Sequence, residues 1–254
     1  MTNTAILFTT HVVHDSIRRQ ILKLRDETRG QGDFYVGYQA DKVSLQLPDG
    51  VTPFPFTLRE LNLLGYSPRV CTLLGGSFHF VLLDFFRHFP GYDYYWLVEY
   101  DVRFNGNWKD FFSFFEDKEE DFVSAHLETV DDFPGWSWWN AVELAGISLK
   151  REDLRKSFNP ICRLSWRALD LLDRRCRLGD RGHYEAVMPT LFHHYRLRMA
   201  DFGGRGRYAY PGCPDLFYAD NPGDDGPDRC THRFRPAYTE EGMTLPNKIY
   251  HPIK

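Results

Sequence analysis

The start of the chain alternates between runs typical of strands and of an amphipathic helix, and this alternation restricts the fold more than any other feature. Residues 4–13 (TAILFTTHVV) and 32–41 (GDFYVGYQAD) are rich in β-branched and aromatic side chains. Between them, residues 14–28 carry Ile and Leu at helical spacing, with Asp15 as the predicted N-cap. Because a strand, a helix and a strand at this spacing form a βαβ unit, we expect a parallel sheet.

The rest of the first half continues this alternation. We expect a loop at 47–56, where Pro and Gly gather. Further helices are expected at 57–66, 75–90 and 107–117. Further strands are expected at 94–102 and 121–128. Thr57 and Glu60 stand in capping-box positions at the start of the first of these helices.

The second half is less regular. A strand or loop leads into a helix within residues 158–175, with Ser165 as the predicted cap, and 182–197 is a further helical region. From Phe202 onward Gly, Pro and Asp dominate, so we expect a long irregular C-terminal segment. The sequence therefore predicts a single α/β domain over residues 1–254, with a central, mostly parallel sheet flanked by helices.

Composition and charge narrow the class of protein. A chain of 254 residues can bury a sizeable core, and a net charge of −4 argues against a general nucleic-acid binder. The five cysteines are odd in number and widely spaced, which favours free thiols in a reducing compartment. The start does not resemble a signal peptide, and no apolar run reaches about 20 residues. We therefore expect a cytoplasmic protein without a membrane span, which leaves peripheral membrane association open. The sequence predicts no oligomeric state.

Two acids interrupt the apolar run at residues 94–102 (YYWLVEYDV). Glu99 and Asp101 are two residues apart, and side chains two apart on a strand point the same way. The run leading into them places both at the carboxyl end of a strand, where ligands of open α/β sheets bind. Adjacent carboxylates repel each other, and a divalent cation such as Mg²⁺ or Mn²⁺ removes that repulsion. The alternative is that both acids cap backbone turns around the following Asn-Gly-Asn.

The α/β start, the mid-chain WLVEYDVRF and the later GHYE together resemble GT-A-type glycosyltransferases, which use nucleotide sugars and have a Rossmann-like sheet. Their hallmark is an acid-x-acid motif, usually Asp-x-Asp, that binds the metal on the donor diphosphate. The resemblance implies Asp101 as the metal ligand, Glu99 as its helper and Mn²⁺ or Mg²⁺ as the ion. It also implies that residues 1–130 bind the nucleotide sugar and residues 131–254 the acceptor. Because Glu replaces the first Asp, strict metal dependence stays open.

The same resemblance implies catalytic residues further along the chain. Glu185, in GHYE, corresponds to the acid that acts as general base toward the acceptor hydroxyl in inverting enzymes of this fold. The structural alternative is that Gly182 is an N-cap and Glu185 the N3 residue of its capping box. His183 would bind the acceptor or simply cap the helix.

The end of the sequence, NKIYHPIK, offers His251 as a further metal ligand and Lys248 and Lys254 as cations for the departing diphosphate. The resemblance implies these roles, since GT-A enzymes frequently return such residues to the metal and the diphosphate. The alternative is a frayed, solvated tail, although Ile249 and Tyr250 offer an apolar anchor.

Two further groups are candidates for substrate contacts. Trp138 and Trp139 lie in an aromatic loop and either stack on a sugar ring or plug the core. At the ends of the first two strands, the fold analogy places residues beside the nucleotide: Thr9, Thr10, His11 and Asp41.

These features predict a glycosyltransferase that moves a sugar from a nucleotide-diphosphate donor to an acceptor hydroxyl. The resemblance suggests polysaccharide or glycan assembly and an inverting reaction with Glu185 as base, and a retaining reaction is open if Glu185 is not the base. Two alternatives remain, a metal-dependent phosphoesterase and a non-catalytic glycan-binding protein on a transferase-like fold.

Overall fold

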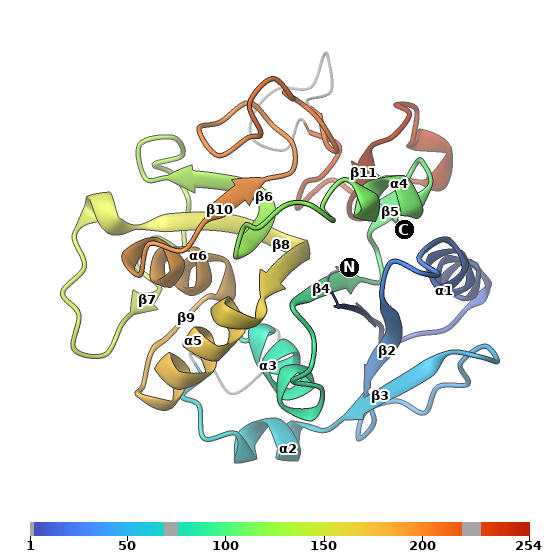
Figure 1. The fold of residues 1–254 in the computed structure, drawn as a ribbon, viewed down its shortest axis with the longest axis horizontal. Helices are drawn as coiled ribbons and strands as arrows, with labels where there is room; N and C mark the ends of the chain where they lie inside the picture. The colour runs from blue at the N-terminus through green and yellow to red at the C-terminus, as the bar shows by residue number, and fades with distance from the viewer. Residues whose placement is uncertain (1–2, 69–75, 220–229) are drawn as a thin grey trace.

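The computed structural model describes residues 3–68, 76–219 and 230–254. Its centre is a seven-stranded sheet (Figure 1). The strands of this sheet are, in chain order, β1 (Thr4–Thr9), β2 (Asp33–Gln39), β3 (Thr52–Phe56), β4 (Tyr94–Glu99), β6 (Phe122–Thr129), β8 (Arg155–Ser165) and β10 (Met199–Asp201).

The strands lie in the order β10-β6-β8-β4-β1-β2-β3. All neighbouring pairs are parallel except the two that involve β8, which runs antiparallel to β4 and β6. The predicted α/β class and mostly parallel sheet are therefore confirmed. Strand order reverses between β1 and β4, so these two strands form a topological switch point, and ligands of open α/β sheets bind at the carboxyl ends of such strands.

Helices cover both faces of the sheet. Successive side chains of a strand point to opposite faces, and in a buried parallel strand both sets are apolar, so both faces need a cover. On β1, Ile6 and Phe8 face one apolar cluster, which also includes residues of α1 (Asp15–Glu27) and α4 (Trp108–Ser113). Leu7 faces the opposite cluster. The helices that contribute to this second cluster are α2 (Leu58–Leu63), α3 (His79–His88), α5 (Trp166–Arg177) and α6 (Tyr184–His194).

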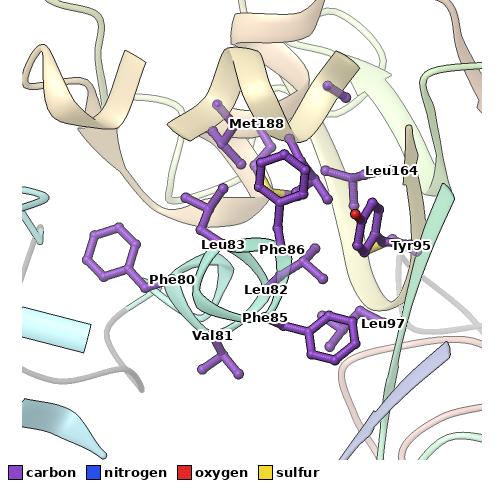
Figure 2. Close-up of a cluster of buried hydrophobic side chains, with 14 of the residues drawn as sticks. Phe80, Val81, Leu82, Leu83, Phe85, Phe86, Tyr95, Leu97, Leu164 and Met188 are labelled. Carbon is purple, nitrogen blue, oxygen red and sulfur yellow. The ribbon is translucent and has the colours of Figure 1, made fainter. Parts of the chain in front are cut away.

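Helix α3 is at the centre of this second cluster (Figure 2). Figure 2 shows its Phe, Leu and Val side chains projecting on all sides of the helix, with Phe85 toward Leu97 of β4 and Phe86 on the side of Met188 of α6, whereas Phe80 and Val81 point away from them. A helix that is apolar on nearly all sides has to be buried. Its packing fixes β4, the strand that carries Glu99 at its end.

Two predicted caps are confirmed. Thr57 and Glu60 form a reciprocal capping box at the start of α2. Ser165 is the N-cap of α5, and its hydroxyl accepts a hydrogen bond from the Ala168 N–H. The predicted cap of α1 is wrong: Asp15 is the first helical residue, and His14 takes the extended N-cap conformation without a side-chain hydrogen bond.

The loop predicted at 47–56 is also wrong in its last part, which forms β3. This strand lies at the edge of the sheet, where Pro is tolerated because its missing N–H faces no partner strand. Pro53 and Pro55 are exposed, whereas Phe54 and Phe56 are buried. The alternation of exposed Pro and buried Phe is the sequence signal for this strand, and the high Pro and Gly content of the segment led to the prediction of a loop instead.

The described residues after β10, 202–219 and 230–254, are largely irregular, as predicted, yet they are fixed to the body of the protein. Among them, β11 (Ile249–Tyr250) pairs with β5 (Arg103–Phe104), and Ile249 and Tyr250 are buried. A second short pair joins β7 (Val142–Glu143) to β9 (Arg181–Gly182), and the 3₁₀ turns are Arg151–Asp153 and Glu240–Gly242. Every helix in the described ranges is too short or too polar to cross a bilayer.

Candidate active site

A tight turn, and not the strand itself, brings the two acids together. Strand β4 ends at Glu99, and the Val102 N–H donates to the Glu99 carbonyl at 3.1 Å, so Asp101 lies within the turn. The expectation that strand alternation aligns the two side chains is therefore wrong. They are close because the turn folds back, and one carboxylate oxygen of each lies within 4.8 Å of the other and of a ring nitrogen of His251.

His251 reaches this turn because β11 pairs with β5, the strand that follows the turn. The Ile253 N–H then donates to the Asp101 carbonyl at 2.9 Å. The Nδ1 of His251 lies 2.6 Å from the Arg233 carbonyl, which can only accept, so Nδ1 carries the proton. In the neutral imidazole, Nε2 is then the nitrogen that can bind a cation, and it lies 3.5 Å from Oδ1 of Asp101.

The chemistry of this group fits a divalent cation. Oδ1 of Asp101 is buried without a hydrogen-bond partner in the described parts of the chain, and Nε2 of His251 lies 3.5 Å from it. Two carboxylates with one imidazole suit Mn²⁺ or Mg²⁺. Burial and, to a smaller extent, the charge of Asp101 together raise the pKa of Glu99 to about 8, although His251 opposes the shift. A cation held here would offset the repulsion between the two acids.

Glu185 stands in the first turn of α6, and its carboxylate is free of the predicted capping box. Gly182 belongs to β9, where it pairs with Val142, so it is not the N-cap. That position is taken by His183, whose Nδ1 accepts from the Glu185 N–H at 3.4 Å. The Nδ1 of His183 also lies 3.7 Å from Oε2 of Glu185.

The environment of Glu185 suits a base that works near neutral pH. Its side chain is only 12% exposed. Burial raises the pKa of Glu185 to about 7, and the Lys156 ammonium and the Asn159 backbone N–H limit the rise. A carboxyl group with such a pKa is half ionised near pH 7, where a general base is most effective.

The structure adds residues that the sequence reasoning did not single out. Tyr184 donates from its hydroxyl to Oε1 of Glu99 at 3.4 Å, which connects the start of α6 to the end of β4. Lys156 lies in β8 and is buried, with its ammonium 2.7 Å from Glu128. Nothing local marks either residue: Lys156 stands between Arg155 and Ser157 in a strand with several polar side chains, and Tyr184 is distinguished only by its place beside Glu185.

The two loop tryptophans have different surroundings. Trp138 is 36% exposed and stacks on His183, with ring centroids 4.8 Å apart and planes at 14°. Trp139 is buried, and its indole N–H donates to the Phe133 carbonyl at 2.8 Å. Trp138 thus borders the Glu185 region, and Trp139 faces the interior.

Residues predicted to contact the nucleotide gather at the switch point, with one exception. Thr9 is in register with Glu99 across the β1–β4 pair, and Thr10 follows it. The ring of His11 is exposed and meets the ring of Tyr100 edge-on at 4.6 Å. The exception is Asp41, whose carboxylate accepts a hydrogen bond at 3.2 Å from the first N–H of α2.

The two C-terminal lysines also differ. Lys248 donates from its ammonium to the Leu216 carbonyl at 2.8 Å, so its charged group is bonded to the irregular segment that precedes β11. Lys254 is exposed and directly follows Ile253, whose N–H is bonded to the turn at Asp101. Of the two, Lys254 is the one placed beside the acids.

Known proteins resemble this chain in structure only. No family model and no curated protein sequence matches it. The galactosyltransferase LgtC, solved with donor and acceptor sugar analogues, is 8% identical, with a TM-score of 0.42 over 78% of this chain and 74% of that one. A glycosyltransferase involved in glycosylation of the major capsid of PBCV-1 is 11% identical, with a TM-score of 0.33 over 67% and 63%.

A protein of Bacillus anthracis assigned as a glucose-1-phosphate thymidylyltransferase, solved with sucrose, is 12% identical, with a TM-score of 0.44 over 78% and 85%. The structural neighbours are thus glycosyltransferases and a nucleotidyltransferase. Because these TM-scores lie below 0.5 and the identities are low, the likenesses decide nothing about this chain, and the assignment of any residue rests on the site itself.

Proposed function

We propose that this chain is a glycosyltransferase that takes a sugar from a nucleotide-diphosphate donor and transfers it to an acceptor hydroxyl. The observation that carries the proposal is the group Glu99, Asp101 and His251, whose ligand atoms lie within 4.8 Å of one another at the carboxyl end of β4. That end belongs to the switch point with β1, where nucleotides bind in doubly wound sheets.

The reaction needs a cation at the diphosphate and a base at the acceptor. Asp101, Glu99 and His251 would hold Mn²⁺ or Mg²⁺, which neutralises charge on the leaving diphosphate when bound. Glu185 removes the proton from the acceptor hydroxyl as its oxygen forms a bond to the sugar C1. The bond from C1 to the diphosphate oxygen breaks, and the configuration at C1 inverts.

The other residues take binding roles in this proposal. Thr9, Thr10 and His11 border the nucleoside, and Lys254 offers a cation to the diphosphate. His183 and the stacked Trp138 contact the acceptor.

We assign structural roles, in place of the predicted substrate contacts, to three further residues, because their side chains make contacts within the fold. Asp41 is tied to the start of α2, Lys248 to a carbonyl, and Trp139 to the interior. From the resemblance, we place the reaction in polysaccharide or glycan assembly in the cytoplasm.

A donor panel tests the proposal. UDP-, GDP- and dTDP-sugars are added to the protein with and without Mn²⁺, and binding is followed by thermal shift, then hydrolysis by release of nucleoside diphosphate. Asp101→Ala should abolish metal-dependent UDP or GDP binding, and Glu185→Gln should keep binding but lose turnover. The exposed Glu143, paired with Arg181 at the surface, supplies the control Glu143→Gln.

Each outcome of this panel bears on a named alternative. Turnover that releases nucleoside monophosphate or inorganic phosphate would identify a phosphoesterase. Sugar binding without any turnover across the panel, by a folded protein, would identify a glycan-binding protein. Unchanged nucleotide binding by Asp101→Ala would remove Asp101 from the metal site.

A further inference from the structure

The turn that carries the two acids has all four of its backbone carbonyls bonded. The Glu99 carbonyl accepts from the Val102 N–H at 3.1 Å, within the turn. The Asp101 carbonyl accepts from Ile253, after β11, and the Val102 carbonyl accepts at 3.2 Å from the side-chain amide of Gln20 in α1. Segments far apart in the sequence therefore hold a turn of four residues.

The remaining carbonyl is bound by a buried arginine. Arg103, in β5, donates from Nη1 to the Tyr100 carbonyl at 2.7 Å and to the Val102 carbonyl at 3.1 Å. Tyr100 is the residue between the two acids, so this bond fixes the peptide plane that separates them. Among the described residues, Arg103 is the only charged group that donates to the backbone of this turn.

The position of Arg103 is costly for the fold. The residue is only 7% exposed, and its one acidic neighbour within 4 Å in the described chain is the half-exposed Glu240, at 3.7 Å. Burying a cation costs several kcal/mol unless it is well paired. This cost of burial is explained if the two hydrogen bonds from Arg103 hold the turn that carries Glu99 and Asp101.

We propose that Arg103 is a positioning residue for the metal ligands: it locks the Tyr100 carbonyl so that the carboxylates of Glu99 and Asp101 face the same cation. The inference rests on the proposed function, because it takes these acids as ligands. Metal sites need their ligands held to within about 0.5 Å. Residues that orient ligands typically contribute about 10- to 100-fold to metal affinity.

The sign of the expected effect separates positioning from simple electrostatics. The charge of Arg103 interacts with Asp101. If charge alone mattered, removing the positive guanidinium would strengthen binding of the metal ion, because two nearby cations repel each other. Weaker metal binding after its removal, measured at a pH where both carboxylates are ionised, therefore points to lost geometry.

The test compares Mn²⁺ binding to the intact protein and to its variants by calorimetry and by the Mn²⁺ EPR spectrum. Arg103→Met keeps an unbranched apolar side chain in place of the arginine stem and removes the donors. The matched control is Arg163→Met, because Arg163 is 1% exposed and also donates to backbone carbonyls. Its guanidinium lies over Tyr94, at the start of β4, the opposite end from Glu99.

Arg103→Met should raise the Mn²⁺ dissociation constant about 10- to 100-fold, and Arg163→Met should leave it within about twofold of the wild type. Both should lower the melting temperature. Arg103→Lys, which keeps a donor to the turn, should recover part of the affinity.

The inference fails if Arg103→Met binds Mn²⁺ as tightly as the wild type or more tightly, or if Arg163→Met loses as much affinity. If Arg103→Met does not fold, Arg103→Lys decides: weaker binding with an unchanged circular dichroism spectrum supports positioning, and unchanged binding overturns it. If the wild type itself binds no Mn²⁺, the proposed function is contradicted. This outcome is distinct from failure of the inference about Arg103, which is read from the variants of a wild type that does bind.

Discussion

Nε2 of His251 lies 3.5 Å from Oδ1 of Asp101, although one residue follows a central strand and the other stands near the end of this sequence. The Nδ1 of the same ring is bonded to the Arg233 carbonyl. The fold therefore sets both the position and the tautomer of the imidazole before any metal arrives, and the same segment holds the backbone of the acidic turn through Ile253.

Substitution of His251 should weaken Mn²⁺ binding without unfolding the protein. In His251→Gln we expect a dissociation constant raised at least about 10-fold, since losing a ligand costs no less than losing an outer-shell partner. Calorimetry measures the change. His88→Gln is the control, because His88 is largely exposed and pairs with Asp84 in α3. Equal loss in both variants would mean that His251 has no special role.

The rate of transfer should depend on the ionisation of Glu185. Its pKa of about 7 predicts that kcat/KM rises as pH increases through 7, because the base acts as the carboxylate. Glu185→Gln should lower the rate about 10²- to 10⁴-fold and remove this rise. A rise of the same midpoint in the residual activity of Glu185→Gln would assign the titration to another group.

The same carboxyl group should make stability depend on pH. Its pKa is about 7 in the folded protein and 4.5, the ordinary value of a glutamate, in the unfolded chain, so the folded state binds the proton more tightly. The resulting stabilisation is complete below pH 4.5 and is lost as pH rises through 7. Glu185→Gln, which resembles the protonated acid, should therefore exceed the wild type at pH 8 by up to about 3 kcal/mol in unfolding free energy, measured by urea denaturation.

The two C-terminal lysines should respond differently to substitution. Lys254→Ala should raise the KM for the donor roughly 3- to 5-fold, because an exposed ion pair is worth at most about 1 kcal/mol. Lys248→Met should leave that KM unchanged and lower the unfolding free energy by about 1 kcal/mol, through loss of the bond to Leu216. Steady-state kinetics and urea denaturation separate the two effects, and the reverse pattern would exchange the roles.

The two loop tryptophans provide a similar contrast. Trp139→Ala should destabilise the protein by about 3–5 kcal/mol, because it removes a buried ring and its hydrogen bond to Phe133. Trp138→Ala should mainly raise the KM for the acceptor, since this ring is partly exposed beside His183. Thermal denaturation and acceptor titrations measure these outcomes. An unchanged acceptor KM in Trp138→Ala would remove Trp138 from the acceptor site.

The sequence by itself determined the features that depend on neighbours along the chain. Periodic apolar residues predicted the alternating strands and helices, and capping chemistry located the starts of α2 at Thr57 and of α5 at Ser165. The run before Glu99 placed that acid at the end of a strand. These signals are local, because spacing and caps act over a few residues.

Only the tertiary structure decided the features that depend on distant contacts. Pro53 fits a strand because that strand lies at the sheet edge, and Asp101 meets His251 because β5 pairs with β11. The pKa of Glu185 comes from burial under segments far away in sequence, and Arg103 reaches the turn only once β5 is in place. Strand pairing and desolvation are set by how the whole chain packs, which no local pattern specifies.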